Sequence, residues 1–117
     1  MHIRTIIGAL IVALLTTNFA YANTERMVRK YYAKYPTLIK IAECESGFRQ
    51  FDDDGRPLKN PGSSATGVMQ LMASYHEKPA RRMGLNIRTI DGNLRYALRL
   101  YKAEGTRPWK ASKHCWG

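Results

Sequence analysis

The stretch Thr37–Gly47, TLIKIAECESG, predicts an amphipathic helix that ends at a glycine. Leu38, Ile41 and Ala42 recur at the spacing that places side chains on one face of a helix, and Glu45 continues that face. The threonine at the start can cap the helix, and the glycine suits its C-terminal end. A carboxylate on an apolar face is unusual, so the pattern singles out Glu45 among the acidic residues.

The second glutamate of this helix, Glu43, points to a different side because it lies two residues before Glu45. Burial disfavours the charged form of a carboxylate and raises its pKa, and the partial negative charge at a helix C-terminus acts in the same direction. A glutamate that stays protonated near neutral pH is a suitable general acid for a glycosidic oxygen. The alternative is a glutamate at the helix end that pairs with Arg49.

The rest of the chain predicts short helices separated by turns. The turn Asp52–Gly55 is typical of a β-hairpin, which we expect over residues 48–59. The expected helices are 24–34, capped by Thr24 and ended by Pro36; 67–74, capped by Thr66; 78–83, with Pro79 in its first turn; and 92–104, capped by Asp91. The tail beyond Gly105 is expected to be irregular and to dock through its two tryptophans. The fold class predicted is a small, mainly α domain with one short hairpin.

The first 22 residues predict a secretory signal peptide. A short positive segment precedes the apolar run Ile6–Leu15, and Ala20–Ala22 supplies the small residues that signal peptidase recognises. Cleavage after Ala22 would leave one domain, residues 23–117, in the periplasm or outside the cell. The alternative is an uncleaved membrane anchor, but the apolar run is shorter than the roughly 20 residues that span a bilayer.

The chain is strongly basic, with 19 Lys and Arg against 9 Asp and Glu and a net charge of +10. On an exported protein this charge predicts an anionic partner, such as a cell-wall polymer or an anionic envelope surface, and export argues against nucleic acid. Helix 92–104 carries a basic stripe, Arg95, Arg99 and Lys102, on a different side from its apolar residues. The alternatives are a solvated basic surface without a partner and a membrane-active protein.

The two cysteines, Cys44 and Cys115, both lie in the part of the chain that would be exported, so they predict a disulfide. The alternative is two free thiols. We expect no metal and no cofactor, because His76 and His114 lack partners at ligand spacing. A calcium loop around Asp52–Asp54 is also disfavoured, because its twelfth position is a proline. These aspartates are read as a solvated turn or as a second catalytic carboxylate.

Two motifs together resemble the soluble lytic transglycosylase (SLT) domain, a lysozyme-like family. The first is Ala42–Phe48, AECESGF, in which a helix ends on Glu-Ser; the second is Gly67–Met72, GVMQLM, which follows a loop rich in small residues. The resemblance implies a lysozyme-like α domain in which a cleft between a helical lobe and a hairpin-bearing lobe holds the glutamate. It covers about residues 36–101, most of the predicted domain.

The resemblance also implies roles for individual residues. Glu45 corresponds to the acid–base residue, and Ser46 to the residue that positions the glycan or the glutamate. Residues expected to line the cleft are Met69 and Gln70, and the aromatic hydroxyl near the glutamate is expected from Tyr101 or from Tyr96. The chain departs from the family because it lacks the Ala-Tyr-Asn motif, and its tail, with Pro108, Trp109, Ser112, Cys115 and Trp116, is the expected replacement.

The function expected from this resemblance is that of an exported lytic transglycosylase acting on peptidoglycan glycan strands. The first alternative is a muramidase that hydrolyses the same bond with a water held by an aspartate of Asp52–Asp54. The second is a cell-wall-binding module on the same fold, without turnover. A role in wall remodelling, in association with a secretion or conjugation machine, or in attack on competitors is equally compatible with the sequence.

Overall fold

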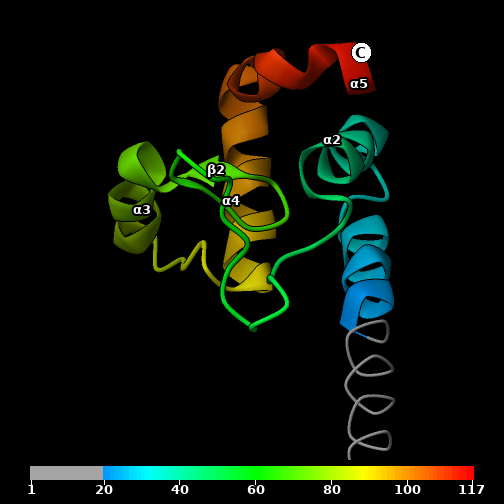
Figure 1. Cartoon of the computed structure of the whole chain (residues 1–117). Helices are drawn as coiled ribbons and strands as arrows, with labels where there is room; N and C mark the ends of the chain where they lie inside the picture. The colour runs from blue at the N-terminus through cyan, green and yellow to red at the C-terminus, as the bar shows by residue number, and fades with distance from the viewer. Residues whose placement is uncertain (1–19) are drawn as a thin grey trace, which may run out of the picture.

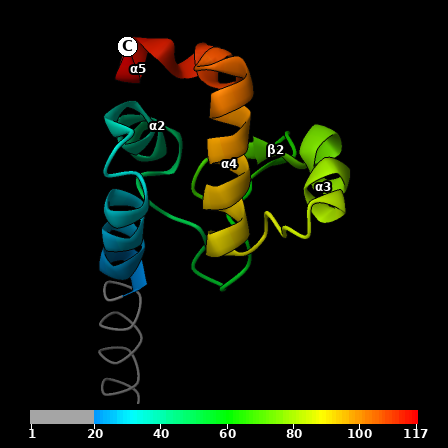
Figure 2. The same cartoon turned by 180° about the vertical axis from the view of Figure 1, so that it is seen from behind.

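The computed structural model describes residues 20–117, and it is mainly helical (Figure 1). A helical segment covers residues 20–31, and the further elements are α2 (Pro36–Ser46), β1 (Ala65–Thr66), β2 (Leu71–Met72), α3 (Ala73–Arg82), α4 (Ile90–Glu104), the 3-10 helix η1 (Arg107–Ser112) and α5 (Lys113–Trp116). Helix α4 stands at the centre, with α2 and segment 20–31 on one side and α3 on the other. From the end of α4, η1 and α5 turn back to α2, which they contact (Figure 2). The predicted fold class is confirmed.

The hairpin lies later in the chain than the sequence predicts. β1 and β2 pair antiparallel, with Ala65 opposite Met72 and Thr66 opposite Leu71. The expected hairpin at 48–59 is reduced to one isolated bridge, between Phe51 and Pro57. The helix expected at 67–74 is wrong, because residues 67–70 form the turn between the two strands.

Two buried amide side chains explain why residues 67–70 form a turn. Gln50 Oε1 accepts the N–H of Val68 at 2.9 Å, and Asn93 Oδ1 accepts the N–H of Met69 at 3.0 Å. Gly67 has φ +75°, a left-handed conformation that interrupts a regular helix. Since buried N–H groups need acceptors, the two amides from distant segments satisfy this turn in place of helical bonds.

Several helix boundaries also differ from the prediction. Helix α3 is a single helix with Pro79 inside it, instead of a short helix that begins near this proline. The cap of α4 is Thr89, whose hydroxyl accepts the N–H of Gly92 at 3.1 Å, so Asp91 lies in the first turn. In each case residues N-terminal to the expected start continue the helix.

The N-terminal helices begin earlier as well. Segment 20–31 already includes Thr24, whose hydroxyl donates to the carbonyl of Ala20 at 3.0 Å, so Thr24 is not the cap. Helix α2 begins at Pro36, and it ends as predicted at Gly47, which adopts a left-handed conformation. Residues 1–19 of the predicted signal peptide lie outside the described residues, and cleavage after Ala22 stays a prediction. Within residues 20–117, no helix combines the length and the apolar character that crossing a membrane requires.

The core is formed by apolar side chains from almost every element. Tyr32, which follows segment 20–31, is fully buried, and its hydroxyl donates to the carbonyl of Leu94 in α4 at 2.7 Å. The other core residues are Val28, Leu38, Ile41, Ala42, Phe48, Val68, Met69, Leu71, Ala80, Ile87, Leu94, Tyr96, Ala97, Leu100 and Trp109. The core therefore links α2, the β1–β2 turn, α4 and the tail into one unit.

The crowding at Gly67 can be tested against Gly55. Both glycines have positive φ, +75° and +79°, but a Cβ on Gly67 would lie 2.7 Å from the Gln50 amide, whereas a Cβ on Gly55 would meet nothing within 4 Å. We expect Gly55→Ala to cost about 1 kcal/mol from backbone strain alone and Gly67→Ala to cost about 3 kcal/mol. Urea unfolding measures both, and equal losses would contradict the crowding.

Candidate functional site

The end of α2 places Glu45 beside the core, as the helical spacing predicts. Leu38 and Ile41 are fully buried, and Glu45 on the same side of the helix is partly buried. Glu43 is exposed. The two glutamates of α2 therefore occupy different environments, and only Glu45 is partly buried.

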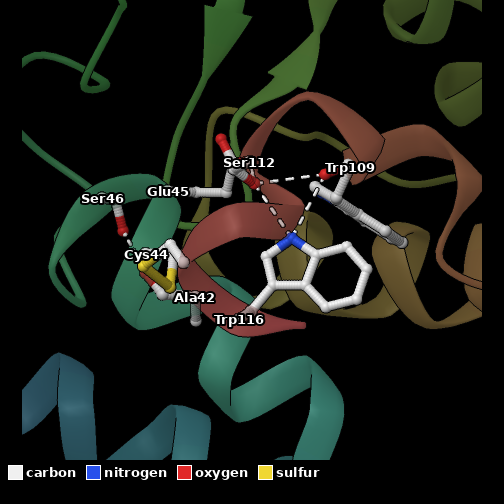
Figure 3. The surroundings of a disulfide bond; sticks show 8 residues. Ala42, Cys44, Glu45, Ser46, Trp109, Ser112 and Trp116 are labelled. Carbon is white, nitrogen blue, oxygen red and sulfur yellow. Dashed lines mark hydrogen bonds between the residues drawn. A yellow bond between two sulfur atoms is a disulfide. The ribbon is translucent and has the colours of Figure 1, made fainter.

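The carboxylate of Glu45 meets a hydroxyl from the opposite end of the chain. Ser112 Oγ, at the end of η1, lies 2.5 Å from Glu45 Oε1 (Figure 3). Burial raises the pKa of Glu45, and the hydrogen bond from Ser112 partly opposes that rise. The net result is a pKa of Glu45 above the usual value of a glutamate side chain.

Two tryptophans hold Ser112 in place. The indole N–H of Trp116 donates to Ser112 Oγ at 3.0 Å and also lies 3.2 Å from the carbonyl oxygen of Trp109 (Figure 3). Trp109 is buried, and its own indole N–H donates to the carbonyl of Met69 at 2.9 Å. The chain of contacts runs from Glu45 through the tail to the β1–β2 turn.

A disulfide fixes the tail to α2. Cys44 and Cys115 are bonded, which confirms the predicted pairing, and the bond joins positions 71 residues apart. Cys44 is adjacent to Glu45 in the chain (Figure 3). Cys115 is adjacent to Trp116 in the chain. The tail docks as predicted, but it is helical rather than irregular.

Ser46 is buried, and its hydroxyl makes contacts within the protein. It lies 2.8 Å from the carbonyl oxygen of Val68 and 3.1 Å from that of Ala42, and it accepts the N–H of Arg49 at 3.1 Å. These contacts join the end of α2 to the β1–β2 turn. In the described structure Ser46 therefore bears on the position of Glu45 through the backbone, and a contact with substrate stays a prediction.

The other predicted cleft residues are distributed as follows. The side chain of Met69 is fully buried in the core, whereas Gln70 is partly exposed and its amide donates to the carbonyl of Gly67 at 2.9 Å. Tyr101 is partly buried and packs edge-on against Tyr35 with ring centroids 6.1 Å apart. Their roles in substrate binding stay predictions.

Tyr96, the other tyrosine proposed to stand near the glutamate, is engaged elsewhere. Its hydroxyl lies 2.9 Å from His76 Nδ1, and its side chain is buried. Burial lowers the pKa of His76 and raises that of Tyr96. The side-chain hydrogen bond described at Glu45 comes instead from Ser112.

The aspartate triplet forms a local turn. Asp52 Oδ1 accepts the N–H groups of Asp54 at 2.9 Å and of Arg56 at 3.0 Å, and the side chains of Asp53 and Asp54 are exposed. This bonding fits the solvated-turn interpretation. Among residues 20–117, no three His, Cys, Asp or Glu side chains are grouped so that they can hold a metal ion.

Sequence reasoning named Ser112 only as part of the tail and gave it no role. The spacing within the tail carries no signal for it, because residue 112 is far from residue 45 along the chain. The signal available was the predicted disulfide, since Cys44 is next to Glu45 and Cys115 is three residues after Ser112. A bridge between these cysteines brings the tail close to Glu45, so only a few tail residues are candidates for contact with its carboxylate.

A hollow that does not include Glu45 lies between segment 20–31 and α4. It is lined by Tyr31, Leu85, Arg95, Leu98, Arg99 and Lys102. The three residues of the predicted basic stripe are exposed, and Arg95 is paired with Asp91 at 2.9 Å. Because its cations lie at the surface and no polar group is buried in it, this hollow is a weaker candidate than the surroundings of Glu45.

The raised pKa of Glu45 gives a pH dependence of stability with a definite sign. The folded state holds the proton of Glu45 more tightly than the unfolded state, so the folded state is favoured at acidic pH and this advantage is lost as the pH rises through the folded pKa. We expect Glu45→Gln, which stays neutral, to gain stability relative to the wild type as the pH rises from acidic to neutral. Urea unfolding at several pH values measures it. Glu43→Gln is the exposed control, and a relative gain that is absent or reversed would contradict the assignment.

The disulfide should carry a large share of the stability of so small a domain. Chain-entropy reasoning for a loop of this length gives about 4 kcal/mol, so we expect the double variant Cys44→Ala/Cys115→Ala to unfold at much lower urea concentration. Treatment of the wild type with a thiol reductant should reproduce the effect. A loss below about 1 kcal/mol would mean that packing of the tail suffices without the bond.

Comparison with known proteins adds no assignment to this site. No protein-family model, no curated protein and no solved structure matches the chain. The interpretation of the site therefore rests on its own residues: a partly buried glutamate with a raised pKa, a serine hydroxyl against its carboxylate, and a disulfide beside both.

Proposed function

We propose that this protein is an exported peptidoglycan lytic transglycosylase, which cleaves the bond between N-acetylmuramic acid and N-acetylglucosamine without consuming water. The observation that carries the proposal is the partly buried carboxyl of Glu45, whose pKa burial raises. Such a group is protonated over a wider pH range than an exposed glutamate, so it can act as a general acid.

In the first step Glu45 donates its proton to the bridging oxygen, and the bond from that oxygen to the muramic C1 breaks. Positive charge develops at C1 and the ring oxygen, and the N-acetyl carbonyl of the substrate stabilises it. The N-acetylglucosamine leaves with a free hydroxyl. Glu45 is now a carboxylate, and the hydroxyl of Ser112 at 2.5 Å is placed to donate to it.

In the second step the Glu45 carboxylate removes the proton of the muramic 6-hydroxyl, and that oxygen attacks C1 of the same sugar. The product is a 1,6-anhydro end, and Glu45 regains the proton with which it started. The cycle requires one enzyme carboxylate. This agrees with a site in which Glu45 is drawn into the protein while Glu43 is exposed.

Charge and cysteine chemistry support the proposed substrate and compartment. The chain carries a net charge of +10, which favours association with an anionic wall polymer or an anionic envelope surface. The Cys44–Cys115 disulfide is compatible with an extracellular or periplasmic location, where such bonds persist. Cleavage after Ala22 would complete the export that this proposal requires.

A muramidase that hydrolyses the same bond is the nearest alternative. It needs a second carboxylate that holds a water on the far side of the sugar. Asp52 is the least exposed of the triplet, but its carboxylate already accepts two backbone N–H groups of its own turn. We therefore favour the mechanism with one carboxylate over the hydrolytic one.

The two glutamates of α2 provide a matched test of the proposed function. We expect Glu45→Gln to lower the rate of sacculus digestion by about a thousandfold, because the amide cannot donate a proton to the bridging oxygen. Glu43→Gln changes a charge on the same helix at an exposed position, so its rate should match that of the wild type. Release of soluble fragments from purified sacculi measures both rates.

Product masses separate the alternatives. Each glycan fragment from a lytic transglycosylase is one water lighter than the fragment with a reducing end that a muramidase releases. Reducing ends throughout the digest would show that the enzyme is a muramidase and would contradict the proposal. Unchanged digestion by Glu45→Gln would remove the catalytic assignment, and binding of sacculi without any turnover by the wild type would favour the cell-wall-binding module.

A further inference from the structure

We propose that Ser112 is a positioning residue that hydrogen-bonds Glu45 in both of its protonation states, so that the glutamate can change from acid to base without movement of the surrounding side chains. The inference rests on the proposed function for its place in the reaction, but its central claim concerns the titration of Glu45 and can be tested without turnover. It also assigns the role of the missing tyrosine motif to the tail.

The ionised state uses the hydroxyl as a donor. Ser112 Oγ carries one hydrogen, which it can donate across the 2.5 Å contact to the ionised carboxylate of Glu45. The indole N–H of Trp116 fills one lone pair of the same oxygen at 3.0 Å. A hydroxyl that accepts a bond becomes a better donor, so Trp116 strengthens the bond from Ser112 to Glu45.

The protonated state uses the same oxygen as an acceptor. A hydroxyl has two lone pairs, so Ser112 Oγ can receive the proton of the Glu45 carboxyl together with the N–H of Trp116. Its own hydrogen then turns to the carbonyl oxygen of Trp109, which lies 3.1 Å away. Every donor in this small network has an acceptor in both states, and only hydrogens move.

The heavy atoms of the network are held in two ways. Trp109 is 2 % exposed and is anchored to the carbonyl of Met69, so its own carbonyl is fixed. The disulfide at Cys115 fixes the turn of α5 that presents Trp116. A positioned group of this kind lowers the reorganisation that accompanies charge change at the reacting carboxyl.

The charged side chains of the helices around Glu45 lie at the protein surface. Those on α2, η1 and α5 other than Glu45 are all exposed: Lys40, Glu43, Arg107, Lys110, Lys113 and His114. The pKa of Glu45 is set by its burial, which raises it, and by the Ser112 hydroxyl, which lowers it. Removal of that hydroxyl should therefore raise the pKa of Glu45.

The experiment is an NMR titration of the side-chain carboxyl carbon of Glu45 in the full chain, with the resonance assigned by its absence in Glu45→Gln. The variants are Ser112→Ala, Ser112→Thr, Trp116→Phe and, as a matched serine elsewhere, Ser74→Ala, which lies at an exposed position on α3. We expect Ser112→Ala to raise the pKa of Glu45 above that of the wild type, because the ionised carboxylate loses a donor. Ser112→Thr should keep the wild-type value, and Trp116→Phe should give a smaller rise.

Sacculus digestion adds a kinetic readout. Ser112→Ala should lower kcat by about tenfold and should shift the alkaline limb of the pH profile to higher pH, because Glu45 stays protonated longer. Ser74→Ala should change neither quantity. A purely structural serine would lower the rate without a shift of that limb.

The outcomes are distinguishable from failure of the proposed function. If Glu45 titrates alike in the wild type, Ser112→Ala and Trp116→Phe, the inference is overturned, whatever the chain catalyses. If these variants shift the titration as expected while Glu45→Gln still digests sacculi, the coupling of Ser112 to Glu45 stands and the proposed enzymatic function is wrong.

Discussion

The disulfide between Cys44 and Cys115 is the constraint on which the site depends. The tail after α4 is short, and apart from Trp109 it places little apolar surface in the core. A covalent bond 71 residues across the sequence holds this tail against the end of α2, which is the point where Glu45 lies. Without such a bond, the entropy cost of ordering the tail would be offset only by the buried Trp109, the partly buried Trp116 and a few hydrogen bonds.

The buried amides of Gln50 and Asn93 act as the second support. They accept the N–H groups of Val68 and Met69, and Asn93 also donates to the carbonyls of Thr66 and Ile87. The carbonyl of Met69 then receives the indole of Trp109. In the described part of the chain no buried side-chain polar atom lacks a partner. The turn that these two amides stabilise is therefore also the part of the protein to which Trp109 of the tail binds.

Partial burial of Glu45 links stability to the proposed chemistry. An ionised carboxylate in that position is less well solvated than at the surface, so its charge disfavours the folded state at neutral pH. The same desolvation raises the pKa of Glu45, which is the direction that the proposed role as a general acid calls for. The hydroxyl of Ser112 stabilises the ionised carboxylate and so reduces the desolvation cost. The two tryptophans hold that hydroxyl in place by hydrogen bonds.

The sequence by itself determined the features that depend on neighbours along the chain. The helical period placed Leu38, Ile41 and Glu45 on one side of α2 and Glu43 on another. Two cysteines in the part of the chain that we expect to be exported predicted the disulfide between them. Gly47 ended the helix as expected, because few other residues adopt its left-handed conformation readily.

The tertiary structure decided what depends on groups distant in sequence. Residues 67–74 have the apolar spacing of a helix. The buried amides of Gln50 and Asn93, however, accept the first N–H groups of this segment, and residues 67–70 form the turn of a hairpin instead. Ser112 reaches Glu45 because the tail folds over α2, where the Cys44–Cys115 bond and the buried Trp109 hold it. Local spacing cannot reveal either contact, since each is fixed by hydrogen bonds and packing between segments that the sequence does not place side by side.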